Sequence, residues 1–181
     1  MKTGLVLVDI QNDYFVGGNM ELVGMEQAAN KVKDLLAKFR DKNLPIFHVQ
    51  HLSIQPDANF FVPETDGVEI NESVLPLPSE IVVQKHYPNS FRETTLLEHI
   101  INKDIRNLTI CGAMSHMCID ATTRAAFDLG FDCTVIEDAC ATRNLEHEGR
   151  TVESQNVHAA FMASLAAVYA TVISAKDFGS T

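Results

Sequence analysis

The sequence predicts an α/β fold in three layers, with a six-stranded, mainly parallel sheet between two layers of helices. Two observations support this prediction. Short apolar runs alternate with segments of helical periodicity along the chain, which is typical of parallel strands joined by right-handed helical crossovers. The 181 residues, of which 46% are hydrophobic, are enough for one core. We therefore expect one domain over residues 1–181, with the Rossmann-like strand order 3-2-1-4-5-6.

The first part of the chain predicts a strand, a helix and a second strand. Residues 3–9 form an apolar run that ends in the carboxylate of Asp9, as a central strand with a polar carboxyl end would. Residues 25–39 keep one apolar stripe at helical spacing, and Pro45 prevents this helix from continuing. Residues 46–51 follow as the second strand.

The pattern is interrupted between the second and third strands. Residues 52–80 have little periodicity and contain four prolines, so they predict a long loop, and loops of this length usually shape a site or are disordered. A short strand at 81–85 then ends in Lys85. A helix that ends at about Asn102 is expected next, with its cap either at Ser90, where residues 90–93 match a capping box, or equally at Thr94.

The last part of the chain repeats the alternation. Its strands are expected at 108–111, 131–137 and 169–173, and its helices from Ser115 to a cap at Gly130 and from about 151 to 167. The second of these helices is rich in alanine, which suits either core packing or a subunit interface.

Composition excludes several classes of protein. A formal net charge of −10 argues against nucleic acid and anionic membranes as partners, because phosphate contacts need clustered lysine and arginine. No apolar run reaches the length of about 18 residues that a membrane span needs, and the N-terminal apolar run is too short for a signal peptide. We expect a cytoplasmic protein with a small-molecule substrate. The four cysteines form no CxxC pair, so disulfides and thiolate-bound zinc are not expected.

Three chemically active side chains are expected at one edge of the sheet. Asp9 and Lys85 end their strands, and Cys118 lies in the first helical turn after the fourth strand, where the helix dipole favours a thiolate. Lys85 would stabilise that thiolate, and Asp9 would accept and return its proton. Singly, each residue also has an ordinary interpretation: a buried cysteine, a capping carboxylate and a solvated ammonium. The residues alone leave both interpretations open.

Three blocks of sequence resemble one enzyme family. LVLVDIQNDY resembles a first strand with a D-x-Q-x-D-F start, QKHYPNSFRETTL resembles a lysine strand followed by S-x-F and T-x-L, and CGAMSHMCIDATTRAA resembles a nucleophile block. In these features the chain is similar to the isochorismatase-like cysteine hydrolases, which include nicotinamidases, carbamoylsarcosine-type amidohydrolases and ureidoacrylate-type amidases. The resemblance spans most of the chain, in order.

The resemblance implies a catalytic triad of Asp9, Lys85 and Cys118. It also implies a cis peptide between Ala113 and Met114, and an oxyanion hole formed by the backbone N–H groups of Met114 and Cys118. Ser115 could equally cap the helix by accepting the Cys118 N–H, and the two roles compete for one hydrogen. A homo-oligomer, either a dimer or a tetramer, is expected from the same resemblance.

No metal and no cofactor are expected. Nicotinamidases of this family bind a metal through a D-x-H pair after the second strand, whereas the corresponding stretch here reads FHVQHLSIQPD. His48 and His51 are three residues apart on a predicted strand, so their side chains should lie on opposite faces. We interpret them as ordinary strand and loop histidines.

The preferred hypothesis is a cysteine-dependent hydrolase of a small carboxamide or N-carbamoyl compound. True isochorismatases of the family tend to lack the nucleophilic cysteine, so Cys118 favours C–N bond cleavage. One alternative is a vinyl-ether hydrolase that uses Asp9 without a covalent step, and a weaker one is a redox or binding module built on Cys118. A dinucleotide-binding dehydrogenase is disfavoured, because no G-x-G-x-x-G follows the first strand. Candidate pocket residues are Tyr14, Phe60, Phe61, Phe91, His116 and Met117, although only the last two are tied by sequence to the nucleophile turn.

Overall fold

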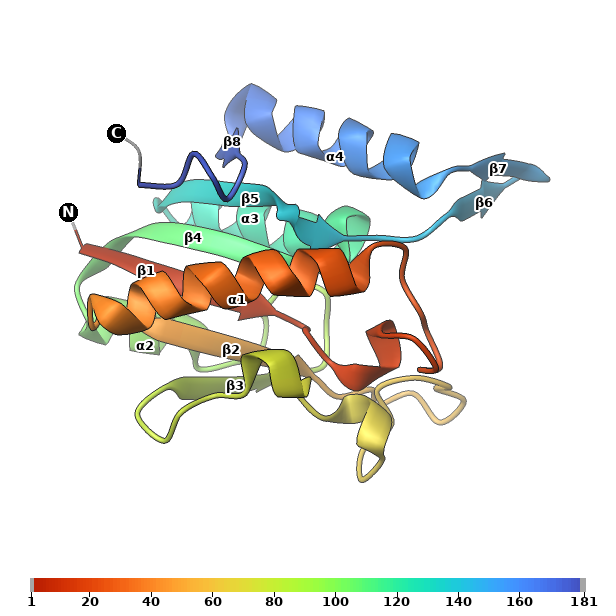
Figure 1. Ribbon diagram of the computed structural model, residues 1–181, viewed down its shortest axis with the longest axis horizontal. Helices are drawn as coiled ribbons and strands as arrows, with labels where there is room; N and C mark the ends of the chain where they lie inside the picture. The colour runs from red at the N-terminus through yellow and green to blue at the C-terminus, as the bar shows by residue number, and fades with distance from the viewer. Residues whose placement is uncertain (1, 180–181) are drawn as a thin grey trace.

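A computed structural model describes residues 2–179, and its centre is a six-stranded parallel sheet (Figure 1). The strand order is β3-β2-β1-β4-β5-β8, which confirms the predicted fold class and strand order. The strands of the sheet are β1 Lys2–Val8, β2 Ile46–His51, β3 Ile81–Lys85, β4 Ile105–Ala113, β5 Asp132–Ala141 and β8 Thr171–Ile173.

Helices cover both faces of this sheet. The α-helices are α1 Met25–Asp41, α2 Leu96–Asn102, α3 Asp120–Asp128 and α4 Ser154–Val168. In Figure 1, α1 crosses the front of the sheet, whereas α2 and α3 lie behind it. Short 3-10 helices occupy Asn12–Tyr14, Asp66–Val68 and Glu72–Val74. Within residues 2–179, none of the helices combines the length and the apolar character that a membrane crossing needs.

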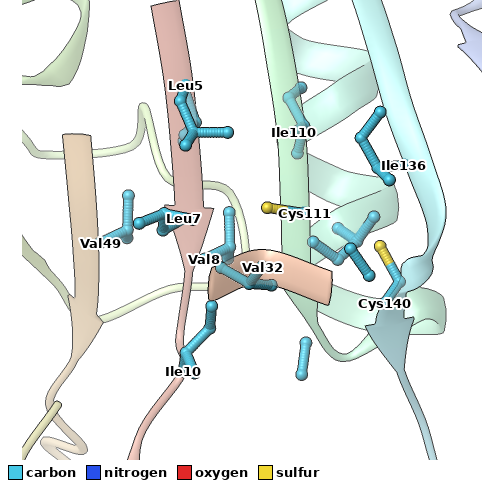
Figure 2. Close-up of a cluster of buried hydrophobic side chains, with 14 of the residues drawn as sticks. Leu5, Leu7, Val8, Ile10, Val32, Val49, Ile110, Cys111, Ile136 and Cys140 are labelled. Carbon is cyan, nitrogen blue, oxygen red and sulfur yellow. The ribbon is translucent and has the colours of Figure 1, made fainter. Parts of the chain in front are cut away.

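The core lies between α1 and the central strands. Figure 2 places Leu7 and Val8 of β1 between Val49 of β2 and Cys111 of β4, with Val32 of α1 across them. These side chains are at most 2% exposed. The apolar stripe of α1 predicted from its spacing is buried at every position: Met25, Ala28, Ala29, Val32, Leu35, Leu36 and Phe39. Burial of such a stripe, rather than helix propensity, supplies most of the stability of a helix of this kind.

One glycine allows β1 and β4 to approach each other closely beside the site. Gly112 has a φ of +123°, and a Cβ at this position would lie 2.0 Å from the Val8 carbonyl oxygen. Only glycine fits such an approach, because the obstacle is backbone and cannot move aside.

Two parts of the secondary structure differ from the prediction. The helix expected from Ser115 starts as a π-helix, η4 Ser115–Ile119, and only then continues as α3. A side-chain pattern with helical spacing does not reveal one wider turn. An antiparallel hairpin, β6 Leu145–His147 with β7 Arg150–Val152, was not expected. Its side chains are exposed or half-buried, so they carry no apolar alternation.

The long loop is ordered against the segment that follows β1. The Asn71 N–H donates to the Ile10 carbonyl, the Asn12 N–H donates to the Glu69 carbonyl, and Gln11 forms an isolated bridge with Ile70. A long loop usually either shapes a site or is disordered, and these contacts favour a loop that shapes a site.

Candidate active site

The fold brings Asp9, Lys85 and Cys118 together at the carboxyl edge of the sheet. Asp9 follows β1, Lys85 ends β3, and Cys118 lies in η4 after β4. The Lys85 ammonium nitrogen lies 2.7 Å from Asp9 Oδ2 and 3.2 Å from Cys118 Sγ. Asp9 and Lys85 are 0% exposed and Cys118 is 3% exposed. These contacts join residues up to 109 positions apart in the sequence, because parallel strands all present their carboxyl ends at the same edge.

Asp9 has a left-handed backbone conformation, which turns the chain where it leaves β1 beside the site. Asp9 has a φ of +53°, and its N–H donates to the Val49 carbonyl at 3.0 Å. Aspartate adopts this conformation more readily than most residues, and such positions are concentrated at functional sites.

The other polar residues of the first sequence block hold loops in place. The Gln11 side chain donates to the Val68 carbonyl and exchanges two hydrogen bonds with the backbone of His51. Asp13 accepts from the Phe61 N–H at 2.6 Å and from the Asn19 N–H at 3.1 Å. One short segment therefore supplies a site carboxylate and two anchors for the loops around it.

The turn that carries Cys118, η4 Ser115–Ile119, is held at both ends; it is called the nucleophile turn below. The Met114 carbonyl accepts from the N–H groups of Met117 and Ile119, and the Ala113–Met114 peptide is cis. Ser115 Oγ lies 2.8 Å from His158 Nδ1 and 3.3 Å from the Ala141 carbonyl oxygen. The hydroxyl of Ser115 therefore bonds to β5 and α4. The alternative prediction, in which Ser115 caps the helix by accepting the Cys118 N–H, is wrong.

The pKa shifts of the three residues differ from the expectation at Cys118. Burial raises the pKa of Asp9, but the positive charge of Lys85 and the nearby His51 outweigh this and lower it. Burial lowers the pKa of Lys85, but the charge of Asp9 and the contact with Cys118 outweigh it and raise that pKa. Burial, followed by the charge of Asp9, raises the pKa of Cys118 more than Lys85 lowers it. The directions of these shifts favour a carboxylate, an ammonium and a neutral thiol at rest, in place of the thiolate expected from the helix start.

His51 belongs to the same cluster, which the sequence did not predict. Its Nδ1 lies 2.9 Å from Lys85 Nζ and 3.8 Å from Asp9 Oδ2. His51 and Lys85 are register partners on β2 and β3, so both end their strands at the same row. The sequence signal that could have found His51 is that it ends its strand, as Lys85 does. His48, in contrast, contacts Glu80 Oε2 at 2.8 Å.

The ligand atoms of Asp9, His51 and Cys118 lie within 4.8 Å of one another, which raises the question of a metal ion. Lys85 Nζ lies among them, 2.7 Å from Asp9, 2.9 Å from His51 and 3.2 Å from Cys118. A second cation between these groups would meet the ammonium at close range, and lysine has no free lone pair to offer while it is protonated. These residues therefore do not fit a metal centre.

Three of the predicted pocket residues form an aromatic cluster beside His51. The ring centroids of Tyr14 and Phe61 are 4.6 Å apart, those of Phe60 and Phe61 are 5.0 Å apart, and Phe61 lies 5.7 Å from the ring of His51. Within residues 2–179 the Tyr14 hydroxyl makes no hydrogen bond, although the side chain is only 1% exposed. Burial, followed by the neighbouring Cys118 and Asp9, raises the pKa of Tyr14 well above the ordinary value, so it remains a neutral phenol.

The other three predicted pocket residues lie in different surroundings. His116 Nδ1 lies 2.6 Å from Thr142 Oγ1, and its ring packs edge-on against Phe161. Met117 is 41% exposed. The ring of Phe91 stacks on Phe131, which directly precedes β5 at the opposite, amino-terminal end of that strand. Phe91 is therefore left out of the pocket that we propose.

Cavity size does not locate this site. A cavity of about 750 Å³ lies beside Asp13, between the segment after β1 and the long loop, and none of its lining residues is Asp9, Lys85 or Cys118. We place the site by its chemistry, because buried charges in direct contact with a thiol are the rarer feature.

Comparison with known proteins agrees with this geometry. A family model for the isochorismatase domain matches residues 3–177. The chain belongs to the isochorismatase family. The family protein YddQ of Bacillus subtilis (strain 168) is 50% identical over 178 residues, which cover 98% of this chain and 99% of YddQ.

Two further relatives are similar to the chain over most of its length. A crystal structure from Oleispira antarctica, assigned to the isochorismatase hydrolases, matches with a TM-score of 0.94 and 49% identity, over 99% of this chain and 97% of that one. Streptothricin hydrolase of Streptomyces noursei is 30% identical over 141 residues, which cover 78% of this chain and 50% of that protein. The isochorismatase family also includes amidohydrolases, and the chain is a hydrolase of this family.

Proposed function

We propose that the chain is a cysteine-dependent amidohydrolase that cleaves the C–N bond of a small carboxamide or N-carbamoyl compound. The observation that carries the proposal is the buried contact of one ammonium, Lys85, with both a carboxylate, Asp9, and a thiol, Cys118. A neutral thiol beside a carboxylate is suited to nucleophilic attack with simultaneous proton removal.

The reaction would proceed in two halves. In the first, Cys118 Sγ bonds to the substrate carbonyl carbon while its proton passes to Asp9, and the oxygen becomes an oxyanion facing the N–H groups of Met114 and Cys118. Asp9 then gives the proton to the leaving nitrogen, the C–N bond breaks, and a thioester remains. In the second half, water gives a proton to Asp9 and adds to the thioester, the C–S bond breaks, and the proton returns to Cys118. Lys85 balances the negative charge that moves between Asp9 and Cys118.

The aromatic cluster supports a small, partly apolar substrate. Tyr14, Phe60 and Phe61 lie on the His51 side of the triad, and His116 and Met117 belong to the nucleophile turn. We assign these five residues to the substrate pocket, with Tyr14 as the polar group that orients the substrate.

The two other hypotheses receive less support. Vinyl-ether hydrolysis by acid catalysis needs a protonated carboxyl, whereas the lowered pKa of Asp9 keeps it ionised near neutral pH. A redox-sensing thiol should be exposed and acidic, whereas Cys118 is 3% exposed and its pKa is raised.

The test is a screen for ammonia release over carboxamides, ureides and N-carbamoyl acids, with the Cys118→Ala variant as the control. We expect at least one class to be turned over, with activity lost in the variant, and a thioester adduct visible by mass spectrometry after rapid quenching. Full turnover by Cys118→Ala would refute covalent catalysis.

We also infer that the chain forms a homo-oligomer, as the family resemblance implies, and that the exposed face of α4 supplies the contact. This face consists of small apolar side chains: Ala159, Ala160, Ala163, Ala166, Ala167 and the 61% exposed Val168. A helix that is apolar all round is ordinarily buried, which favours a second copy as its cover. Light scattering should give a multiple of the 20.0 kDa chain mass and the monomer mass for Ala163→Glu. A monomeric wild type would overturn the inference.

A further inference from the structure

We propose that His51 is a fourth functional residue of this site: it holds the Lys85 ammonium in an orientation that leaves Oδ1 of Asp9 free to act as the base. The proposal rests on the amidohydrolase function proposed above and adds a positioning residue to it. It is based on the contacts of the ammonium, on the unpartnered Oδ1 of Asp9, and on the anchoring of His51.

The Lys85 ammonium donates to three acceptors besides its ion pair with Asp9. Lys85 Nζ donates to His51 Nδ1 at 2.9 Å, to the Tyr87 carbonyl at 3.1 Å and to Cys118 Sγ at 3.2 Å. An ammonium can only donate, so His51 Nδ1 is the acceptor in this hydrogen bond.

Asp9 pairs with the ammonium through one of its two oxygens. Its Oδ2 lies 2.7 Å from Lys85 Nζ, whereas within residues 2–179 its Oδ1 has no hydrogen-bond partner. A fully buried carboxylate with unused lone pairs is costly to maintain, and it is also the arrangement that a base needs if it is to accept a proton from a thiol.

His51 keeps one N–H of the ammonium directed away from Asp9. If the imidazole were removed, this N–H of Lys85 would lose its acceptor, and Asp9 Oδ1 would be an unused acceptor beside it. The ammonium would then turn further toward Asp9, would occupy the lone pair that receives the proton, and would weaken its hydrogen bond to Cys118. Such a change affects the reaction step more than substrate binding.

The backbone of His51 is anchored more firmly than the end of a strand requires. Gln11 Oε1 accepts from the His51 N–H at 2.8 Å, and Gln11 Nε2 donates to the His51 carbonyl at 2.8 Å. Gln11 comes two residues after Asp9. The base and the residue that protects it are therefore tied to the same short segment, and the ring of Phe61 supports the imidazole from the other side.

The test compares two variants of nearly equal size, His51→Asn and His51→Leu. Asparagine can place its amide oxygen near the position of Nδ1 and so keeps an acceptor for Lys85, whereas leucine does not. We expect kcat to fall about 100-fold in His51→Leu, with KM changed less than about 3-fold, and to stay within about 10-fold of the wild type in His51→Asn. His147→Leu, at an exposed position of the β6–β7 hairpin, is the matched control and should leave kcat unchanged.

A second readout does not depend on the substrate. Alkylation of Cys118 by iodoacetamide should be slowed in His51→Leu and nearly normal in His51→Asn, because Lys85 and Asp9 both act on the thiol. Failure of Cys118→Ala to abolish amide hydrolysis would count against the proposed function, whereas the alkylation rates test His51 alone.

Either of two results would overturn the role of His51: equal losses in His51→Asn and His51→Leu, or no loss in His51→Leu. If His51→Leu does not fold, His51→Ala is assayed with added imidazole, since the His51 side chain is 15% exposed and an exogenous ring can reach it. Restored kcat supports the acceptor role, and no restoration in a folded variant overturns it.

Discussion

Cys118 illustrates how burial can reverse an expectation based on a residue's place in a helix. A helix start favours a thiolate, but the thiol is buried next to the carboxylate of Asp9, and both effects raise its pKa. We therefore predict that the rate of Cys118 alkylation by iodoacetamide rises with pH without a plateau up to about pH 9. Mass spectrometry of the labelled peptide measures this rate, with Cys118→Ser as the control. A plateau near pH 7 would mean that a thiolate is already present in the resting site.

Tyr14 has a nearly buried hydroxyl beside the site. Its hydroxyl makes no hydrogen bond within residues 2–179, and its raised pKa keeps it a neutral donor. We predict that Tyr14→Phe raises KM about 10-fold for a substrate found in the screen, with kcat changed little, because a uniform binding contact is lost. Tyr169→Phe, at the end of α4, is the matched control. An unchanged KM in Tyr14→Phe would remove Tyr14 from the pocket.

At the scale of secondary-structure elements, Glu80 connects a helix, a strand and a turn. Its carboxylate accepts two hydrogen bonds from Arg40 of α1, contacts His48 of β2 and accepts from the Leu77 N–H. Burial raises the pKa of Glu80, but these contacts outweigh it and lower the pKa to about 2.

This pKa shift leads to a prediction about stability and pH. A carboxyl group whose pKa is lowered by folding stabilises the protein above its unfolded pKa of 4.5, and the contribution is lost as the pH falls toward 2. We predict that Glu80→Gln lowers the free energy of unfolding by about 1 kcal/mol at pH 7, because solvent screens the half-exposed Arg40, and by much less near pH 2.5. Urea unfolding at the two pH values measures this. Equal losses at both values would show that shape, not charge, is responsible.

Sequence reasoning placed elements well where one physical signal dominates. The bounds predicted for the second and third strands, 46–51 and 81–85, agree with β2 and β3, because turn-forming or proline-rich stretches flank them. The wider turn at Ser115–Ile119 and the exposed hairpin carry no distinctive apolar period, so they were missed. Asp9, Lys85 and Cys118 could be placed together because each ends or follows a parallel strand. The role of His51 could not, because it depends on which strands are neighbours and on their register.

At the scale of the whole molecule, the site is assembled from distant segments, and Asp13 is a main point where they are tied together. Its carboxylate accepts from the Phe61 N–H of the long loop and from the Asn19 N–H, and a Cβ on Gly67 would lie 2.2 Å from it. The aromatic side of the proposed pocket therefore depends on one buried carboxylate that does no chemistry itself.

This dependence predicts the effect of Asp13→Asn. The change preserves size but turns one acceptor oxygen into a donor, so the N–H of either Phe61 or Asn19 faces another donor, at a cost of about 1–3 kcal/mol. We expect faster limited proteolysis within residues 52–80 and a rise in KM, while the sheet keeps its structure by circular dichroism. Asp57→Ala, an exposed change in the same loop, should alter neither. Unchanged proteolysis in Asp13→Asn would mean that the loop is held by its backbone contacts to Ile10 and Asn12 alone, and the pocket would then be independent of Asp13.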